Sequence, residues 1–304
     1  MNIPENLPLF VFFEDAHSYF HTPDMEIYPS MSGLVKWYSP PFEGDYWLYN
    51  KAIREVVKEK RWVKARKDAR LVGRENGIPP IEFLQALEAS LSSDEQHQIK
   101  IVQKRLKGEW KIKNALGSTY GTRYHHQREE EDRKAGGAEN PVTFEWQEIP
   151  IYIDKELCDN HSLTDRLEDL PDGYYPELLV FDLAAGICGQ VDRCWIWTDE
   201  EGERWFAFSD YKSNWDKRTK SAFGTLLYPF DNYPDDATHA YAIQQGGYAM
   251  IMERAGFSFS GFLNLEWVQD FGKKPSVHQN LPYLRDEIQQ AFTLLELKKS
   301  LNTL

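Results

Sequence analysis

Two aromatic-rich runs separated by a short acidic turn constrain this chain more than any other feature. Residues 187–197 and 205–212 are rich in aromatic and β-branched residues, a composition that predicts two strands. Between them, Glu200-Glu201-Gly202 is typical of a three-residue hairpin loop with glycine in the left-handed position. The sequence therefore predicts an antiparallel hairpin, and with it a β-sheet, near the middle of the chain.

The register of this hairpin brings two acidic residues together. If Asp199 pairs with Glu203 across the loop, counting back along both strands places Asp192 opposite Asp210. Directly opposed residues have Cβ atoms about 4.5–5.5 Å apart, and two carboxylates that close repel unless a cation lies between them. Oxygen ligands of this kind suit Mg²⁺ or Mn²⁺. The alternative interpretation is a solvated hairpin with ordinary surface acids.

A lysine follows the second of these acids at a spacing that matters in a strand. Side chains of a strand alternate between its two faces, so Asp210 and Lys212 point the same way and Tyr211 points the opposite way. A carboxylate and an ammonium on one face can serve a single reacting centre. The carboxylate then holds a metal, and the ammonium steadies developing negative charge.

Two predicted helices flank the hairpin and carry further polar side chains. Residues 114–131 predict a helix that begins at a glycine-rich turn and carries His125, whose imidazole would complete a metal site. A structural or solvated histidine is the alternative. Residues 240–256 predict a second helix with Gly256 as its C-terminal cap, and Gln244 and Tyr248 lie one turn apart on it.

These polar motifs follow one another in a fixed order along the chain. In order they are Gly121-Thr122, His125, Glu177, Gly189, Asp192, Asp210, Lys212-Ser213, Gln244 and Tyr248. The set resembles the PD-(D/E)XK nuclease superfamily, and most of all its RecB-type and lambda-exonuclease-type branch, which includes the mitochondrial genome maintenance exonuclease. The opening around Phe12–Tyr19 and the insert Tyr228–Asp236 are similar to phage- and virus-encoded members.

The resemblance implies a role for each matching residue. It assigns the divalent metal, Mg²⁺ or Mn²⁺, to four ligands: His125, Asp192, Asp210 and the backbone carbonyl of Tyr211. It assigns further catalytic roles to four side chains: Glu177, Lys212, Gln244 and Tyr248. In this scheme Lys212 orients or activates the attacking water and stabilises the phosphorane charge, and Glu177 positions water or a second metal. Gln244 and Tyr248 line the site and contact the phosphate or the lysine.

The cysteines depart from one pattern of this branch. Many RecB-type members hold an iron–sulfur cluster with four cysteines, whereas this chain has only Cys158, Cys188 and Cys194 and no C-x-x-C pair. We therefore expect no iron–sulfur cluster. Three cysteines without an obvious pairing also suit a reducing compartment.

Charge is unevenly distributed along the chain. The net charge is −13, yet residues 51–74 hold ten basic residues against three acidic ones, and residues 100–113 hold six against one. Phosphate contacts come from such local patches rather than from the overall sum. We expect contact with DNA from a set of six residues: Lys60, Arg61, Lys64, Lys67, Arg123 and Ser213. The alternative is that the basic runs are solvated helix faces.

The predicted elements fit an α/β protein. They are a β-hairpin at 9–28, helices within 31–75 and 80–113, strands at 142–153, 177–183, 187–197, 204–212 and 258–268, and a final helix at 281–300. With the resemblance, they predict a PD-(D/E)XK restriction-endonuclease-like core, a central mixed β-sheet flanked by helices, over residues 116–304. Residues 1–115 would form an N-terminal β-hairpin and a basic helical arm.

The function expected from these features is metal-dependent hydrolysis of DNA phosphodiester bonds by an exonuclease, in DNA replication, recombination or repair. Its partners would be single- or double-stranded DNA and a recombination or replication protein. A catalytically inactive DNA- or protein-binding module on the same fold is the alternative. Glycan processing, prompted by the carboxylates and the 14% aromatic content, gives Lys212 no role beside Asp210. No apolar run approaches the ~20 residues that span a bilayer, and no secretory signal is expected, so we expect a cytoplasmic protein, in the host cell if phage-encoded.

Overall fold

The structure is a computed structural model of the chain, and it describes residues 10–13, 18–23, 25–57, 67–68, 71–72, 80–152, 167–213, 224–269 and 274–302. The chain forms two compact units, one made of Met1–Pro40 with Tyr120–Leu304 and the other of Pro41–Thr119. The sequence predicted a division at residue 115, with everything before it in one region. The first forty residues instead group with the sheet, because Tyr28, Met31 and Leu34 are buried in its hydrophobic core.

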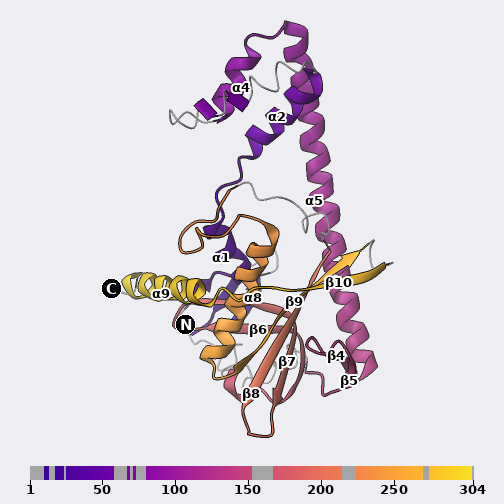
Figure 1. Cartoon of the computed structure of the whole chain (residues 1–304), viewed down its shortest axis with the longest axis vertical. Helices are drawn as coiled ribbons and strands as arrows, with labels where there is room; N and C mark the ends of the chain where they lie inside the picture. The colour runs from indigo at the N-terminus through magenta and orange to yellow at the C-terminus, as the bar shows by residue number, and fades with distance from the viewer. Residues whose placement is uncertain are drawn as a thin grey trace, which may run out of the picture. The chain divides into compact units, whose positions relative to one another are not determined.

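A five-stranded mixed sheet forms the centre of the first unit (Figure 1), as the sequence predicted. Its order is β10-β9-β8-β7-β6, and the strands are β6 (Gly173–Asp182), β7 (Ile187–Thr198), β8 (Arg204–Lys212), β9 (Ser258–Gln269) and β10 (Lys274–Asn280). All neighbouring pairs are antiparallel except β8 and β9, which are parallel. A parallel pair needs a crossover connection, and here the crossover contains helix α8 (Ala237–Arg254).

The hairpin between β7 and β8 has the predicted register. The Asp199 N–H donates to the Glu203 carbonyl oxygen at 2.9 Å, and Gly202 has φ of 85°, a left-handed conformation that glycine adopts without strain. The ladder runs from Thr198 opposite Arg204 to Arg193 opposite Ser209. The hairpin prediction is therefore confirmed, and β8 has the predicted bounds.

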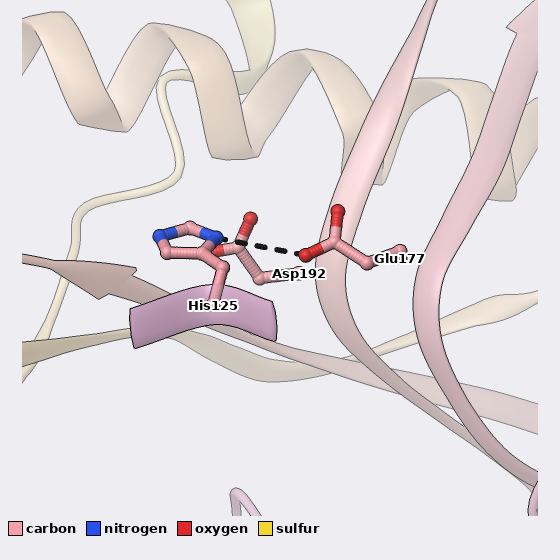
Figure 2. A group of neighbouring side chains, drawn as sticks. All are labelled: His125, Glu177 and Asp192. Carbon is pink, nitrogen blue, oxygen red and sulfur yellow. Dashed lines mark ion pairs between the residues drawn. The ribbon is translucent and has the colours of Figure 1, made fainter. Parts of the chain in front are cut away.

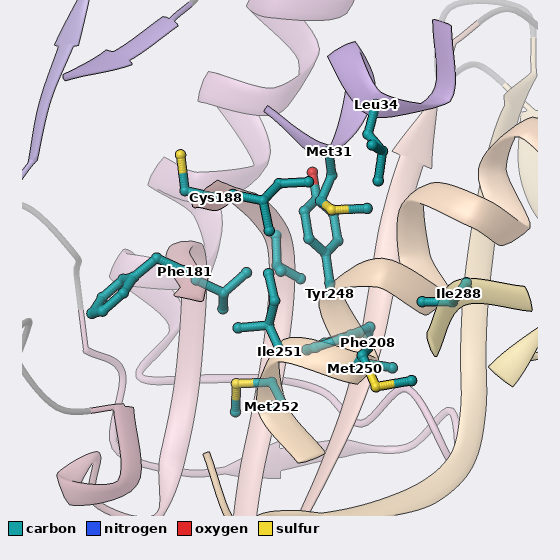
Figure 3. Packing of buried hydrophobic residues seen from close by; sticks show 14 of the residues in the cluster. Met31, Leu34, Phe181, Cys188, Phe208, Tyr248, Met250, Ile251, Met252 and Ile288 are labelled. Atoms are coloured by element: carbon teal, nitrogen blue, oxygen red, sulfur yellow. The ribbon is translucent and has the colours of Figure 1, made fainter. Parts of the chain in front are cut away.

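Three helices pack together on one side of the sheet. Helix α8 contacts α1 (Met31–Tyr38), α9 (Arg285–Asn302) and strands β6 and β9. The apolar side chains at this junction are buried, and Figure 3 shows Tyr248 and Ile251 among them. A Cβ on Gly247 of α8 would lie 1.8 Å from Met31 Cε, so glycine here leaves room for the buried Met31 side chain of α1.

Helix α8 is defined by signals in the sequence. The Asp236 side chain accepts a hydrogen bond from the His239 N–H at 2.9 Å, which satisfies one of the free N–H groups at the helix start. Gly256 follows the C-terminal cap residue Ala255 with φ of 92°, as the predicted C-terminal glycine should. The helix that carries Gln244 is therefore confirmed.

A small second sheet precedes α1. Its strands are β1 (Phe10–Phe13), β2 (Ser18–His21) and β3 (Glu26–Tyr28), all antiparallel. The sequence predicted a two-stranded hairpin over residues 9–28, and the structure adds the third strand. Tyr28 ends this strand fully buried, and Lys299 of α9 donates to its hydroxyl at 2.6 Å. The sheet is thereby joined to the same unit as the C-terminal helix.

The second unit, Pro41–Thr119, is helical. It contains α2 (Gly44–Val56), α4 (Pro80–Glu88) and the first part of α5 (Ser93–Ala135). A small core holds it together, with Ala52 and Ile53 of α2 buried against Leu84, Ile99 and Leu106. Most of the predicted basic run at 51–74 lies outside the described residues.

Several predicted boundaries are wrong. The helix with His125 does not begin at a glycine-rich turn near residue 114, because it is part of α5. Each interior glycine costs only about 1 kcal/mol relative to alanine, too little to interrupt this helix. The predicted strand at 142–153 is reduced to β5 (Trp146–Glu148), which pairs with the unpredicted β4 (Gly137–Glu139).

The C-terminal region also differs in detail. Strand β10 was not predicted, since its polar sequence Lys274–Asn280 shows no apolar alternation. Helix α9 begins at Arg285 rather than at residue 281. Between β8 and α8, residues 214–223 lie outside the described residues, and residues 224–236 contain no helix or ladder strand. No helix among the described residues has the length and apolar character needed to cross a membrane.

Candidate metal centre

The candidate centre lies where β7 and β8 approach the end of their ladder. One step beyond the Arg193–Ser209 pair, the same register places Asp192 opposite Asp210, as the sequence predicted. The Tyr211 N–H donates to Asp192 Oδ2 at 2.8 Å and fixes the orientation of that carboxylate. Two acidic side chains therefore occupy neighbouring positions on adjacent strands.

Three side chains from different elements converge at this point (Figure 2). His125 Nδ1 of α5 lies 3.5 Å from Glu177 Oε1 of β6 and 3.5 Å from Asp192 Oδ2 of β7. One ligand atom from each of the three lies within 4.8 Å of the others. Their side chains are 28%, 31% and 10% exposed, so solvent ions have access. An imidazole and two carboxylates form a donor set that fits a divalent metal.

Glu177 reaches this cluster through an unusual backbone conformation. Pro176 pairs with Arg193 and Leu178 pairs with Val191, so Glu177 lies across from Asp192 at the one position without a ladder pair. Its φ is 55°, in the left-handed region that costs a residue other than glycine about 1–3 kcal/mol. Strain of this kind persists where the surrounding structure holds it, and here it accompanies the approach of Glu177 to the other ligands.

The assignment of ligands differs from the expected one. His125 and Asp192 belong to the group of candidate ligands, and Glu177 joins them in place of Asp210. Asp210 instead forms an ion pair with Lys212, and the two side chains are 2% and 16% exposed. Asp210 thus sits beside the cluster with its charge directed at the lysine. The Tyr211 carbonyl as a ligand stays a prediction.

Helix α8 supplies a polar edge to the same region. Gln244 Nε2 donates to the Tyr248 hydroxyl at 3.2 Å, the pairing expected from their spacing of four residues. One turn earlier, the Tyr241 ring centroid lies 4.8 Å from Lys212 Nζ, a cation–π contact that holds the ammonium in place. Tyr241 was not predicted from the sequence, although its spacing of three residues from Gln244 places it on the same helix face.

The glycine of the Gly189-x-x-Asp192 motif has a packing role. A Cβ at Gly189 would lie 2.8 Å from Cε1 and 3.1 Å from the hydroxyl oxygen of Tyr248, closer than atoms in contact tolerate. The glycine therefore lets the tyrosine lie directly over strand β7. A second tyrosine approaches the same strand, because the Tyr19 hydroxyl of β2 donates to Gln190 Oε1 at 3.3 Å.

Electrostatics in this cluster are dominated by crowded carboxylates. Burial lowers the pKa of the His125 imidazole, but Asp192, Glu177 and Asp210 outweigh burial and raise the pKa to about 9. Burial and the nearby Asp192 raise the pKa of Asp210 to about 7, against the opposing effect of Lys212. Burial also raises the pKa of Asp192. The crowded carboxylates therefore favour a positive charge on the groups among them.

The lysine responds to the same carboxylates. Burial lowers the pKa of Lys212, but Asp210 and Asp192 outweigh it and raise the pKa above its ordinary value. The ammonium is therefore charged throughout the neutral range. A permanent cation beside a cluster of carboxylates is suited to binding an anionic group or stabilising negative charge that develops there.

A second charged cluster, which was not predicted, forms around Arg193, the residue after Asp192 in β7. Arg193 Nη1 lies 3.6 Å from Glu266 Oε2, and its Nε donates to the Tyr174 hydroxyl at 2.7 Å. The guanidinium carbon lies 5.2 Å from the centroid of the Tyr211 ring. Arg193 is 3% exposed. The signal in the sequence was an arginine directly after Asp192, within a strand rich in apolar residues.

The residues predicted to contact DNA are only partly described. Lys60, Arg61 and Lys64 lie outside the described residues. Lys67 and Arg123 are exposed, and neither lies in the metal cluster. Ser213 follows β8 and lies close to α5, since a Cβ on Gly121 would be 3.4 Å from its Oγ.

Two of the three cysteines are buried in the sheet. Cys188 and Cys194 are both free, and burial raises the pKa of each thiol. Cys158 lies outside the described residues. The expected absence of an iron–sulfur cluster stays a prediction.

Comparison with other proteins supplies no relative. A scan against models of protein families and searches of curated proteins and of solved structures found no match to this chain.

Proposed function

We propose that this protein is a metal-dependent deoxyribonuclease of PD-(D/E)XK type that hydrolyses DNA phosphodiester bonds and acts as an exonuclease. The observation that carries the proposal is the junction of the His125–Glu177–Asp192 cluster with the Asp210–Lys212 ion pair. Metal ligands and a fixed ammonium beside one another are what hydrolysis of a phosphodiester requires. The divalent metal ion would neutralise the charge of the phosphate, and the ammonium would stabilise the negative charge of the pentavalent transition state.

The residues present fit a divalent metal. His125, Glu177 and Asp192 would hold Mg²⁺ or Mn²⁺, which when bound supplies Lewis-acid neutralisation of phosphate charge. The imidazole favours Mn²⁺, since Mg²⁺ prefers oxygen ligands. Asp210 keeps Lys212 oriented toward the cluster, and the Tyr241 ring restricts the ammonium from a second side.

The remaining side chains of the proposed site each have a distinct task. Lys212 Nζ orients the attacking water and stabilises charge on the phosphorus centre. The Gln244–Tyr248 pair lies at the edge of the same region and offers hydrogen bonds to phosphate oxygens. These side chains would contact phosphate oxygens and not the edges of the bases, so hydrolysis should not depend strongly on DNA sequence.

The direct test is incubation of end-labelled DNA with the full-length protein in Mn²⁺, Mg²⁺ or EDTA. We expect nucleotides to be released from linear DNA with either metal, none in EDTA, and no cleavage of covalently closed circular DNA. Cleavage of the circle would show an endonuclease instead. An absence of hydrolysis with every metal and DNA form would refute the proposed function and favour a silent binding module.

The Lys212→Ala variant tests the site assignment in the same assay. Hydrolysis should fall by about a thousandfold, since removal of one group that stabilises transition-state charge costs about 10²–10³ in rate. DNA binding should persist. The matched control is Lys274→Ala, which removes an exposed lysine on β10 away from the cluster and should leave the rate unchanged. Equal rates for the two variants would remove Lys212 from the site.

A further inference from the structure

One side of helix α5 within the unit Pro41–Thr119 presents a stripe of lysines to solvent. The stripe consists of four exposed side chains: Lys100, Lys104, Lys107 and Lys111. Their spacing of four, three and four residues keeps them on one side of the helix. At a rise of about 1.5 Å per residue, the stripe is about 16 Å long.

The orientation of this stripe is fixed by the core of its unit. Ile99 and Leu106, on another side of α5, are fully buried against α2 and α4. The packing of these two residues determines which side of the helix faces outward. The lysines therefore form a constant feature of the surface of this unit.

The lysines of the stripe are not used in ion pairs within the described part of the chain. The neighbouring Arg105 binds two carboxylates, those of Glu55 and Glu109, each at 2.5 Å. In contrast, no described carboxylate lies within 4.0 Å of the four lysine ammonium groups. Four uncompensated positive charges in a row on a chain of net charge −13 point to an anionic partner.

We propose that this lysine stripe binds the phosphate backbone of DNA, an inference that rests on the proposed function and names where its substrate is held. A row of regularly spaced cations is complementary to a strand that carries one phosphate about every 3.4 Å along its axis. Flexible ammonium groups bind phosphate as point charges and do not read base edges. The stripe therefore supplies affinity that is independent of sequence.

An anionic membrane surface is the competing partner. Exposed Ile101 and Ile112 lie beside the stripe, and basic helices with an apolar face bind membranes. However, Arg105 lies on the same side of the helix as the two isoleucines, and it is paired with Glu55 and Glu109. This ion pair interrupts the apolar surface, so the side of α5 that would enter lipid is charged. The observations favour nucleic acid.

The test compares two charge-reversal variants of the full-length protein. In the first, all four stripe lysines are changed to glutamate: Lys100→Glu, Lys104→Glu, Lys107→Glu and Lys111→Glu. The matched control carries the same change of net charge at four exposed lysines outside the unit Pro41–Thr119: Lys36→Glu, Lys134→Glu, Lys274→Glu and Lys298→Glu. Binding to a fluorescent DNA duplex is measured in EDTA over a range of KCl concentrations, so that hydrolysis plays no part.

The stripe variant should lose on the order of a hundredfold in affinity at ~0.15 M salt, since each phosphate contact contributes about −0.9 to the slope of log K against log salt. Its slope should become shallower by about 3–4. The control should keep the wild-type slope and most of the affinity. Circular dichroism confirms folding, and a second variant with glutamine at the four positions gives the same change of slope if the glutamate variant is unstable.

Three results would overturn the inference. An unchanged slope in the stripe variant means that the lysines do not contact phosphate. Equal losses in the stripe variant and the control mean that overall charge alone controls binding. Wild-type protein that binds vesicles of phosphatidylserine and phosphatidylcholine, but not the duplex, identifies the membrane as the partner. If the wild-type protein binds DNA in a salt-dependent way but does not hydrolyse it, the proposed function is refuted, while the inference that the stripe binds DNA stands.

Discussion

Asp192 and Arg193 are consecutive in β7, yet they belong to two charged clusters of opposite character. Asp192 lies among carboxylates that outnumber their cationic partners: Glu177, Asp192 and Asp210 meet only His125 and Lys212. Arg193 forms a buried ion pair with Glu266 and is held between tyrosine rings. The first cluster has an excess of negative charge, whereas in the second a carboxylate is paired with a guanidinium.

The difference separates a binding site from a structural pair. Ligand side chains in the first cluster are 10–31% exposed, so an ion from solvent can enter and relieve the repulsion. The side chains of Arg193 and Glu266 are 3% and 9% exposed, and they already form an ion pair with each other. Burial alone therefore does not mark a functional centre, whereas converging carboxylates with access to solvent do.

The largest effect should follow from removal of a ligand in the first cluster. Asp192→Asn keeps an acceptor for the Tyr211 N–H but loses the negative charge, so Mn²⁺ affinity should fall at least about a hundredfold. DNA hydrolysis should fall by about a thousandfold, because several kcal/mol of charge stabilisation is lost. Calorimetric titration with Mn²⁺ measures the first quantity. Asp231→Asn, at an exposed position, is the control, and equal affinities for both variants would exclude Asp192 as a ligand.

The second cluster should respond in stability rather than in metal binding. Arg193→Met removes the ion-pair partner of the buried Glu266, which should cost about 3–5 kcal/mol in the free energy of unfolding measured with urea. Adding Glu266→Leu should recover most of this loss, since an apolar pair can replace a buried ion pair. Mn²⁺ affinity should be retained in the double variant. A loss below about 1 kcal/mol in the single variant would mean that the pair behaves like a surface salt bridge.

The smallest effect concerns pH. The pKa of His125 is about 9 in the metal-free protein, so the imidazole is protonated at neutral pH and must release its proton to bind a metal. Mn²⁺ affinity should therefore rise about tenfold per pH unit between pH 6 and 8, and level off above the pKa. Titrations in buffers of different ionisation enthalpy measure the proton released.

Two neighbouring histidines make this pH dependence easy to assign. His125→Ala should bind Mn²⁺ more weakly and with a flatter pH profile. His126→Ala, which removes a histidine whose side chain is 71% exposed, should keep the wild-type profile. If the His125→Ala profile is as steep as that of the wild type, the proton comes from another group and the imidazole is not a ligand.

Local signals predicted the parts of the fold that depend on residues near one another in the chain. The three-residue loop ending in Gly202 and the alternation of side chains set the β7–β8 register, which in turn brought Asp192 opposite Asp210. Gly256 marked the C-terminal end of α8, whereas the helix begins at Ala237, before the predicted residue 240. The spacing of Asp210 and Lys212 placed both side chains on one face of the strand, but the ion pair between them was not predicted.

Tertiary structure decided the rest of the candidate site. Glu177 lies next to His125 and Asp192 because β6 pairs with β7 and because the backbone of Glu177 is in a left-handed conformation. No local sequence pattern predicts either feature. Glu266 meets Arg193 only because β9 returns parallel to β8 after the α8 crossover. Tyr19 reaches Gln190 across 171 positions of sequence.

The sequence by itself thus determined the hairpin, the C-terminal end of α8 and the order of polar residues, since hydrogen bonds and side-chain alternation within a few residues specify them. Which carboxylates share a cation, and which are neutralised by a buried arginine, was decided only when distant strands packed together. The physical reason is that these charges interact over a few ångströms in space, while the residues that bear them are separated by tens of positions along the chain.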